Sequence, residues 1–172
     1  MAAPRILPRD YLKARRLKLK AHGIVYPATT VAEARRAGLK IDLACAILLQ
    51  ETSGGHNVFG HDAVRNPVQG GYVTYARYRQ YLTYRQRGQG SQGVGPCQLT
   101  YFAFQDRADR LGGCWQPWLN MRVGFTDLAA NIRRTNEWAG IKLYNGSGAK
   151  ASHYADEVTK RAEILRHFGV HD

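Results

Sequence analysis

The segment 42–49 constrains the fold of this chain more than any other part of its sequence. It is DLACAILL, and after Asp42 the apolar residues follow one another without the stripe that marks a helix with one face in solvent. A helix of this kind is stable when it is buried all round, so the sequence predicts that it forms the centre of the core. The apolar run ends at Glu51, and Ser-Gly-Gly at 53–55 breaks the helix just after that carboxylate.

Further helices are predicted by apolar residues at helical spacing and by stop signals. Thr30 and Glu33 have the spacing of a capping box, and Gly38 is placed to end the helix that they begin. The predicted helices outside the central one cover residues 10–20, 30–38, 75–85, 100–111, 121–137 and 151–168.

The segments between these helices predict a minor β part. Residues 53–71 are rich in Gly, Asn, Asp and Pro, and short β-type pieces at 57–59 and 72–75 predict one or two small hairpins among the helices. Residues 87–95, RGQGSQGVG, predict a flexible loop that is too polar to pack. We therefore expect an α+β fold that is mostly α, with a buried central helix and a small β-hairpin region.

The length of the chain favours one compact unit. At 172 residues, a domain buries about 70% of the surface of its unfolded chain, which is enough for a core without disulfides or a structural metal. We expect a single domain over 1–172, with 1–40 as a basic helical segment packed on it. Leu alternates with Lys and Arg in 10–20, which suits the solvated face of a packed helix or an arm for a membrane surface or nucleic acid.

The charge balance indicates a polyanionic partner. With 25 Lys and Arg against 13 Asp and Glu, the net charge is +12, which suits nucleic acid, an anionic membrane surface or the acidic polymers of a bacterial cell wall. No segment approaches the roughly 20 apolar residues of a membrane span, and the N-terminus lacks the apolar region of a signal peptide. We expect synthesis in soluble form, no stable membrane insertion, and export only with help.

Glu51 is the first candidate for chemistry. Its predicted position combines the negative end of a helix macrodipole with an apolar core, and both disfavour the ionised carboxylate. A carboxyl group that stays protonated toward neutral pH is suited to be the general acid in glycosidic cleavage. The alternative is a plain surface residue at a helix end.

Two glycine-flanked motifs follow in order: GVGPCQLT at 93–100 and YNGSG at 144–148. Together with Glu51 they resemble the soluble lytic transglycosylases and goose-type lysozymes of glycoside hydrolase family 23. That family carries Glu-Ser after an apolar helix, then Gly-Leu-Met-Gln-Leu/Ile, then Ala-Tyr-Asn-x-Gly. GGHNVFGHD and FQDRADRLGGCW are also similar to the catalytic domains of lysin A endolysins from phages of mycobacteria and related actinobacteria. The resemblance covers 42 to about 166 and implies a lysozyme-like fold.

The resemblance implies roles for individual residues. Glu51 is expected to be the catalytic acid, and Tyr144 to hold the Glu51 carboxylate through its hydroxyl. The residues expected to bind substrate are Thr52, Ser53, Gly95, Gln98, Tyr144 and Asn145. Gln98 is expected to offer its amide to the sugar. Thr52 departs from the usual Ser, and Cys97 departs from the usual Met.

Asp62 is the candidate for a second catalytic carboxylate. It is expected either to position water for hydrolysis or to cap a loop, and without a base the relatives form an anhydro product through the sugar's own hydroxyl. His56, His61 and Asp62 lack a third ligand at a familiar metal spacing, and the three cysteines are odd in number without C-x-x-C. We therefore expect no metal, no disulfide framework and no cofactor.

The expected function is that of a phage endolysin, which cleaves the MurNAc-β-1,4-GlcNAc bond of peptidoglycan as a lytic transglycosylase or muramidase. The expected protein is a monomer that is made in the host cytoplasm and acts on the cell wall after release, without binding nucleic acid. Trp115, Trp118 and the aromatic residues of 72–87 are expected to stack on sugars or to pack in the core. The alternative from another class is a basic nucleic-acid-binding module without catalysis.

Overall fold

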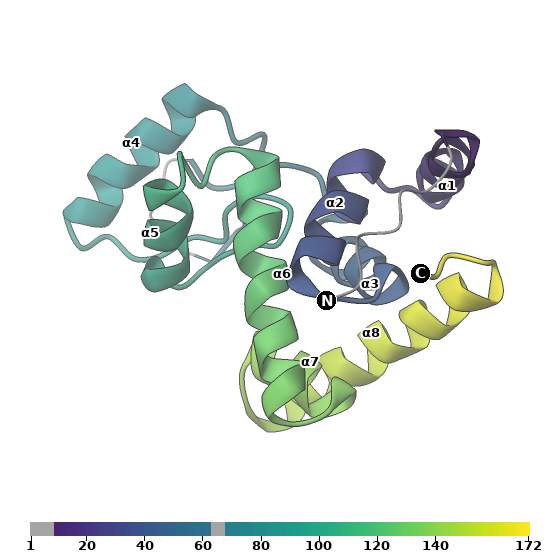
Figure 1. Cartoon of the computed structure of the whole chain (residues 1–172). Coiled ribbons are helices and arrows are strands. Elements are labelled where there is room, and N and C mark those ends of the chain that lie inside the picture. Colours follow the sequence, from purple (N-terminus) through teal and green to yellow (C-terminus); the bar gives the residue numbers. More distant parts are fainter. Residues whose placement is uncertain (1–8, 63–67) are drawn as a thin grey trace.

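The computed structural model of the protein describes residues 9–62 and 68–172. None of the helices in these two ranges combines the length and the apolar character needed to cross a bilayer. The described residues form eight α-helices (Figure 1): α1 Arg9–Ala21, α2 Pro27–Ala37, α3 Ile41–Thr52, α4 Tyr75–Gln86, α5 Phe102–Arg110, α6 Pro117–Arg134, α7 Glu137–Asn145 and α8 Gly148–His167.

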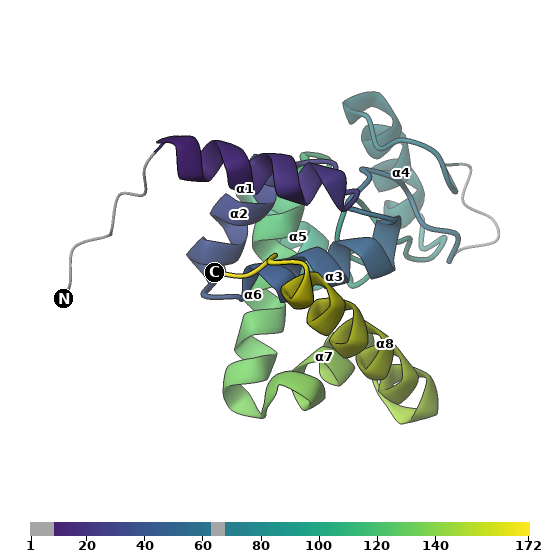
Figure 2. The same cartoon turned by 90° about the vertical axis from the view of Figure 1, so that its right-hand side faces the viewer.

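Helix α3 lies at the centre of the core, as its apolar sequence predicts. Every residue from 41 to 48 is buried, including the carboxylate of Asp42. α2 and α8 pack on α3, and α1 packs on the outer side of α2 (Figures 1 and 2). The buried charge of Asp42 is paired, because the guanidinium Nη2 of Arg166 on α8 lies 2.6 Å from Asp42 Oδ2.

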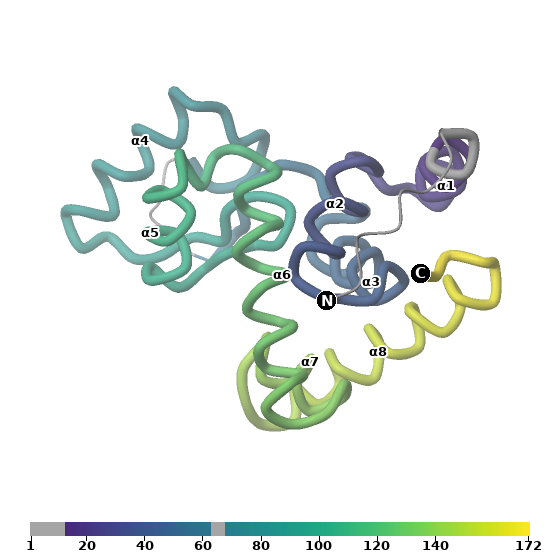
Figure 3. The backbone as a smooth tube through the Cα atoms, viewed as in Figure 1, coloured from purple at the N-terminus to yellow at the C-terminus, as the bar shows by residue number. Residues whose placement is uncertain are grey.

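Helix α6 divides the molecule into two sides (Figure 1), with α4 and α5 on one side and α1, α2 and α3 on the other. α6 is joined to α2 by Arg122, whose guanidinium donates to both carboxylate oxygens of Glu33 at 2.9 and 3.0 Å. The connecting segments 53–62 and 87–101 gather between α3, α5 and α6 in the backbone trace of Figure 3. This is the region in which the sequence motifs meet.

The predicted β-hairpin region is absent from the described residues, and the α+β fold class is wrong. β-type pairing in these residues is limited to isolated bridges: Val58 with Tyr72, Phe59 with Val94, and Val94 with Leu99. The fold is all-helical, with no sheet among the described residues, so only the expectation of a mostly α chain agrees with it. Part of the predicted hairpin region, 63–67, lies outside the described residues.

The backbone around Phe59 divides its hydrogen bonds between two segments, and this prevents a regular ladder. The N–H of Phe59 donates to the carbonyl of Gly71 at 2.9 Å. The next N–H, of Gly60, donates instead to the carbonyl of Gly93 at 2.8 Å. Gly71 also has φ of 69°, in the left-handed region that an extended strand does not contain. The glycines that predicted hairpin turns bend the chain at too many places for strands to form.

The predicted capping box of the second helix is also wrong. α2 begins at Pro27, whose fixed φ suits the first helical turn, three residues before Thr30. The Thr30 hydroxyl donates to the carbonyl of Tyr26 at 2.9 Å. Glu33, which the capping box requires at the helix start, is instead the buried partner of Arg122. Glu33 therefore has a tertiary role, as the partner of Arg122, and does not cap the start of α2.

The other predicted helices are present, with shifted ends, and one helix was not predicted. α2 ends at Gly38 in the left-handed conformation, with φ of 70°, as expected for a stop signal. α7 was not predicted, and it contains the first two residues of the YNGSG motif. The loop 87–95 was expected to be too polar to pack, yet its second half, from Gln92 onward, is buried.

Gly54 gives a test of how tightly the end of α3 packs against the chain that follows α1. A Cβ on Gly54, with φ of 113°, would lie 2.0 Å from the carbonyl oxygen of Gly23, whereas a Cβ on Gly38 would meet nothing within 4 Å. Gly38→Ala should cost about 1 kcal/mol for backbone strain alone. Gly54→Ala should lower the free energy of unfolding by more than about 3 kcal/mol in urea titrations. Equal losses for the two variants would contradict the close packing at Gly23.

Candidate active site

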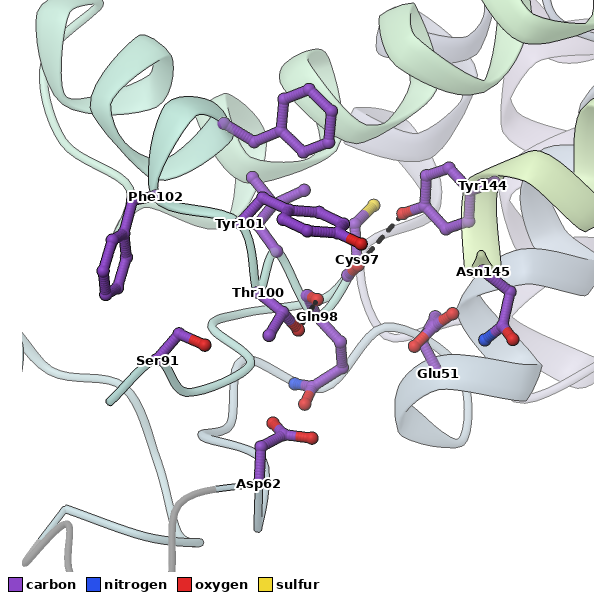
Figure 4. Close-up of a pocket in the computed structure, with 12 residues that line it drawn as sticks. Glu51, Asp62, Ser91, Cys97, Gln98, Thr100, Tyr101, Phe102, Tyr144 and Asn145 are labelled. Carbon is purple, nitrogen blue, oxygen red and sulfur yellow. Dashed lines mark hydrogen bonds between the residues drawn. The ribbon is translucent and has the colours of Figure 1, made fainter. Parts of the chain in front are cut away.

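A cleft of about 540 Å³ opens at the C-terminal end of α3 (Figure 4), and its volume is within the range of small-ligand sites. The structure brings five of the predicted site residues to it from separate parts of the chain. The residues that line the cleft are Glu51, Asp62, Ser91, Cys97, Gln98, Leu99, Thr100, Tyr101, Phe102, Phe104, Tyr144 and Asn145. Thr52, Ser53 and Gly95 are not among them.

Glu51 occupies the last turn of α3 and points its carboxyl group into the cleft (Figure 4). Burial raises the pKa of Glu51 from 4.5 to about 7. A hydrogen bond from the hydroxyl of Tyr154 opposes this shift by lowering the pKa, and the negative charge of Asp62 adds to it. The direction agrees with the expectation from the sequence, and desolvation is its main cause.

The partner of Glu51 is Tyr154, and the expectation that Tyr144 would hold this carboxylate is wrong. The hydroxyl of Tyr144 donates to the backbone carbonyl of Cys97 at 3.0 Å, and so joins α7 to the GVGPCQLT segment. The signal for Tyr154 is present in the sequence. It is an aromatic residue with a polar end, on the buried face of α8 between Ala151 and Val158.

Gln98 is held in an unusual conformation at the middle of the cleft. Its φ of 45° is one of two positive values at non-glycine residues in the described chain. Its side-chain NH₂ donates to the carbonyls of Val58 at 3.0 Å and Gly95 at 2.9 Å. Both donors are therefore used, so of the amide that was expected to face the sugar, the oxygen Oε1 is the part available to a ligand.

Asp62 is fixed next to Gln98 by the backbone. Its Oδ2 accepts a hydrogen bond from the N–H of Gly93 at 2.8 Å. A Cβ on Gly60 would lie 2.7 Å from Asp62 Oδ2 and 2.6 Å from Gln98 Oε1, so a side chain at this position would displace both oxygens. Two acceptors thus share one small region of the cleft, which suits a water molecule that donates to both or a sugar hydroxyl that donates to one of them.

The wall of the cleft formed by GVGPCQLT is held by two buried amide side chains that were not predicted. Asn120 of α6 donates to the carbonyl of Val94 at 2.7 Å and accepts from the N–H of Cys97 at 2.9 Å. Gln105 of α5 donates to the carbonyl of Leu99 at 2.7 Å. Both amides are 0% exposed. Asn120 supplies an acceptor for the buried N–H of Cys97, and the two amides add a second donor to the carbonyls of Val94 and Leu99, which already accept from each other's N–H.

Thr52, Ser53 and Gly95 support the site without lining it. The buried hydroxyl of Thr52 donates to the carbonyl of Pro96 at 2.9 Å, which ties the end of α3 to the cleft wall. Ser53 ends α3 in the left-handed conformation with φ of 53°. A Cβ on Gly95 would lie 2.6 Å from the Asn120 side chain, so this glycine faces the interior of the protein rather than the cleft.

The cysteines and histidines do not add a metal site in the part of the chain that the structure describes. No group of three or more His, Cys, Asp or Glu side chains is placed there to hold an ion. The three cysteines are buried free thiols. Burial raises the pKa of Cys45 and of Cys114 to about 12, and raises the pKa of Cys97 still further, so none is a thiolate at neutral pH.

The raised pKa of Glu51 predicts a pH-dependent cost to stability. Between pH 4.5 and about 7 the carboxyl ionises in the unfolded chain before it ionises in the folded one, so this group's contribution to stability falls as pH rises through that window. Relative to the parent protein, Glu51→Gln should therefore gain on the order of 3 kcal/mol in free energy of unfolding between pH 4 and pH 8. Urea unfolding at both pH values measures this gain. Glu163→Gln, at an exposed carboxyl on α8, is the control for loss of one negative charge. A constant difference between parent and Glu51→Gln would contradict the raised pKa.

No protein family model, curated protein or solved structure matches this chain. The resemblance to family 23 glycosidases therefore stays a prediction from the three ordered sequence motifs. The structure brings Glu51, Gln98, Tyr144 and Asn145 from these motifs to one cleft.

Proposed function

We propose that this protein is a peptidoglycan glycosidase of the phage-endolysin type, which cleaves the MurNAc-β-1,4-GlcNAc bond with Glu51 as general acid. The observation that carries the proposal is the state of Glu51. Its carboxyl faces a cleft, accepts a hydrogen bond from Tyr154, and has a pKa that burial raises to about 7. A group with this pKa is available in its acid form at near-neutral pH.

In this mechanism Glu51 gives its proton to the glycosidic oxygen while the bond from that oxygen to the anomeric carbon breaks. The leaving sugar departs as an alcohol, Glu51 is left ionised, and positive charge develops on the sugar ring. The carboxyl group of Asp62 also lines the cleft (Figure 4), where its negative charge stabilises that positive charge.

Asp62 bears on which reaction follows. In hydrolysis, Asp62 takes a proton from a water molecule that attacks the anomeric carbon. In transglycosylation, the sugar's own hydroxyl attacks and returns a proton to Glu51, which gives an anhydro product. The hydrogen bond from the Gly93 N–H fixes Asp62 in the cleft, and the Gln98 Oε1 beside it is a second acceptor for a water molecule, which favours the role of holding water.

The charge distribution supports a cell-wall substrate over nucleic acid. The net charge of +12 attracts the protein to an anionic wall, yet two carboxyl groups and no Lys or Arg are among the described residues that line the cleft. A phosphate backbone in this cleft would meet like charge. We place synthesis in the host cytoplasm and action at the wall after release, with the basic surface as the targeting element.

Clearing of purified bacterial cell walls, followed by turbidity, tests the proposal. Glu51→Gln keeps the shape of the side chain and removes its proton-donating acid, so the clearing rate should fall at least about 100-fold. Glu163→Gln should clear walls at the parent rate. Clearing by Glu51→Gln at the parent rate refutes the role of Glu51. Tight DNA binding by a parent protein that clears no walls favours the nucleic-acid alternative. Mass spectrometry of the released fragments then separates the two reactions, since the anhydro product is lighter by one water. Asp62→Asn should slow both reactions and should lower the share of the hydrolytic product.

The hydrogen bond from Tyr154 predicts a shift in the pH profile. This bond favours the ionised carboxylate, so Tyr154→Phe should raise the pKa of Glu51 further. Activity that requires the acid form of Glu51 falls as pH rises through its pKa, and in Tyr154→Phe this fall should move to higher pH. Initial clearing rates from pH 5 to pH 9 measure the shift. A lower rate with an unchanged pH profile would show that Tyr154 serves only to pack α8.

A further inference from the structure

Two exposed aromatic rings form a part of the cleft that the proposed reaction at Glu51 does not use. Tyr101 is 66% exposed and Phe102 is 40% exposed, whereas aromatic residues of the core such as Tyr81 and Phe125 are 0% exposed. Both exposed rings line the cleft. In Figure 4, Phe102 lies at the end of the cleft far from Glu51, and Tyr101 lies between them. The aromatic shelf is defined here as Tyr101 and Phe102.

The rings of the aromatic shelf are held in place before any ligand binds. Tyr101 packs edge-to-face on Phe104, with ring centroids 6.0 Å apart and planes at 89°. The guanidinium of Arg85 lies over the Phe102 ring, 4.3 Å from its centroid. Arg85 is itself ion-paired with Asp106. One face of Phe102 is therefore covered by an engaged cation, and its exposed surface remains available to an apolar partner.

The composition of the cleft selects the class of partner. The shelf offers apolar ring surface, and hydroxyls of Ser91 and Thr100 line the same cleft. The carboxyls of Glu51 and Asp62, with no Lys or Arg among the described lining residues, disfavour a polyanionic strand. A saccharide fits this composition, because its C–H faces are apolar, its hydroxyls donate and accept, and it carries no phosphate.

We propose that Tyr101 and Phe102 form saccharide-binding subsites, on which a β-1,4-linked amino-sugar chain stacks as it extends away from Glu51 along the cleft. The inference rests on the proposed function for the identity of the glycan. The inference adds that the cleft binds several consecutive sugars on the Tyr101 and Phe102 side of the cleaved bond, so the protein should prefer long glycans to disaccharides. Trp115 and Trp118, which were expected from the sequence either to stack on sugars or to pack in the core, do not line the cleft.

Binding to a protein that cannot cleave tests the inference. The full chain with Glu51→Gln is titrated by calorimetry with β-1,4-linked GlcNAc oligomers of two to six units. The hexamer should bind more tightly than the dimer. Tyr101→Ala and Phe102→Ala, each added to Glu51→Gln, should weaken hexamer binding by about tenfold and leave dimer binding nearly unchanged. Phe168→Ala is the matched control, because Phe168 is 57% exposed at the end of α8 and does not line the cleft.

The outcomes separate this inference from the proposed function. Hexamer binding that depends on Tyr101 and Phe102, in a chain whose parent form clears no walls, supports the shelf and refutes the catalysis. If the parent protein clears walls and both alanine variants leave hexamer binding unchanged, the saccharide-binding role of the aromatic shelf is refuted and the proposed glycosidase function stands. Absence of saccharide binding overturns the inference, as does Tyr101-dependent binding of a single-stranded oligonucleotide in place of saccharide. Circular dichroism of each variant confirms that the fold is retained.

Discussion

The burial of α3 on every side is the constraint on which the rest of the structure depends. Residues 41–48 contribute no exposed surface, so α2 and α8 must pack around them, and the helix reaches the surface only at its C-terminal end. Glu51 is placed at that end. Because burial is the largest cause of its raised pKa, the packing that stabilises the core also sets the acidity of the candidate catalytic group.

An all-helical protein must hold the extended wall of its cleft by other means than a sheet. Here buried side-chain amides do so, with Asn120 bonded to Val94 and Cys97, and Gln105 bonded to Leu99. Each amide both donates and accepts in a fixed geometry, so one side chain replaces part of a neighbouring strand. This arrangement requires α5 and α6 to pack on the same side of the cleft wall 93–100. The shape of the cleft therefore depends on the packing of two helices that contribute few residues to the cleft lining.

Sequence reasoning succeeded where the pattern is local and failed where a partner is distant. The continuous apolar run of 42–49 predicts its own burial, and the raised pKa of Glu51 follows from that burial with no knowledge of neighbours. The β-hairpin prediction failed because glycines at 60–71 serve close approach and bending rather than hairpin turns. Glu33 was misassigned because its partner Arg122 is remote in sequence. Tyr154 was missed because its role depends on the register between α3 and α8.

That register has a consequence for how such a chain can change over time. α8 runs antiparallel to α3, and polar contacts join the two helices near both ends of α3. Arg166 forms an ion pair with Asp42 in the first turn of α3, and Tyr154 donates a hydrogen bond to Glu51 in its last turn. Inserting or deleting one residue between these contacts in either helix rotates one contact by about 100° relative to the other. Substitutions on the outer face of α8 leave this alignment intact. The lineage of this protein should therefore accumulate point changes along α8 while conserving its length.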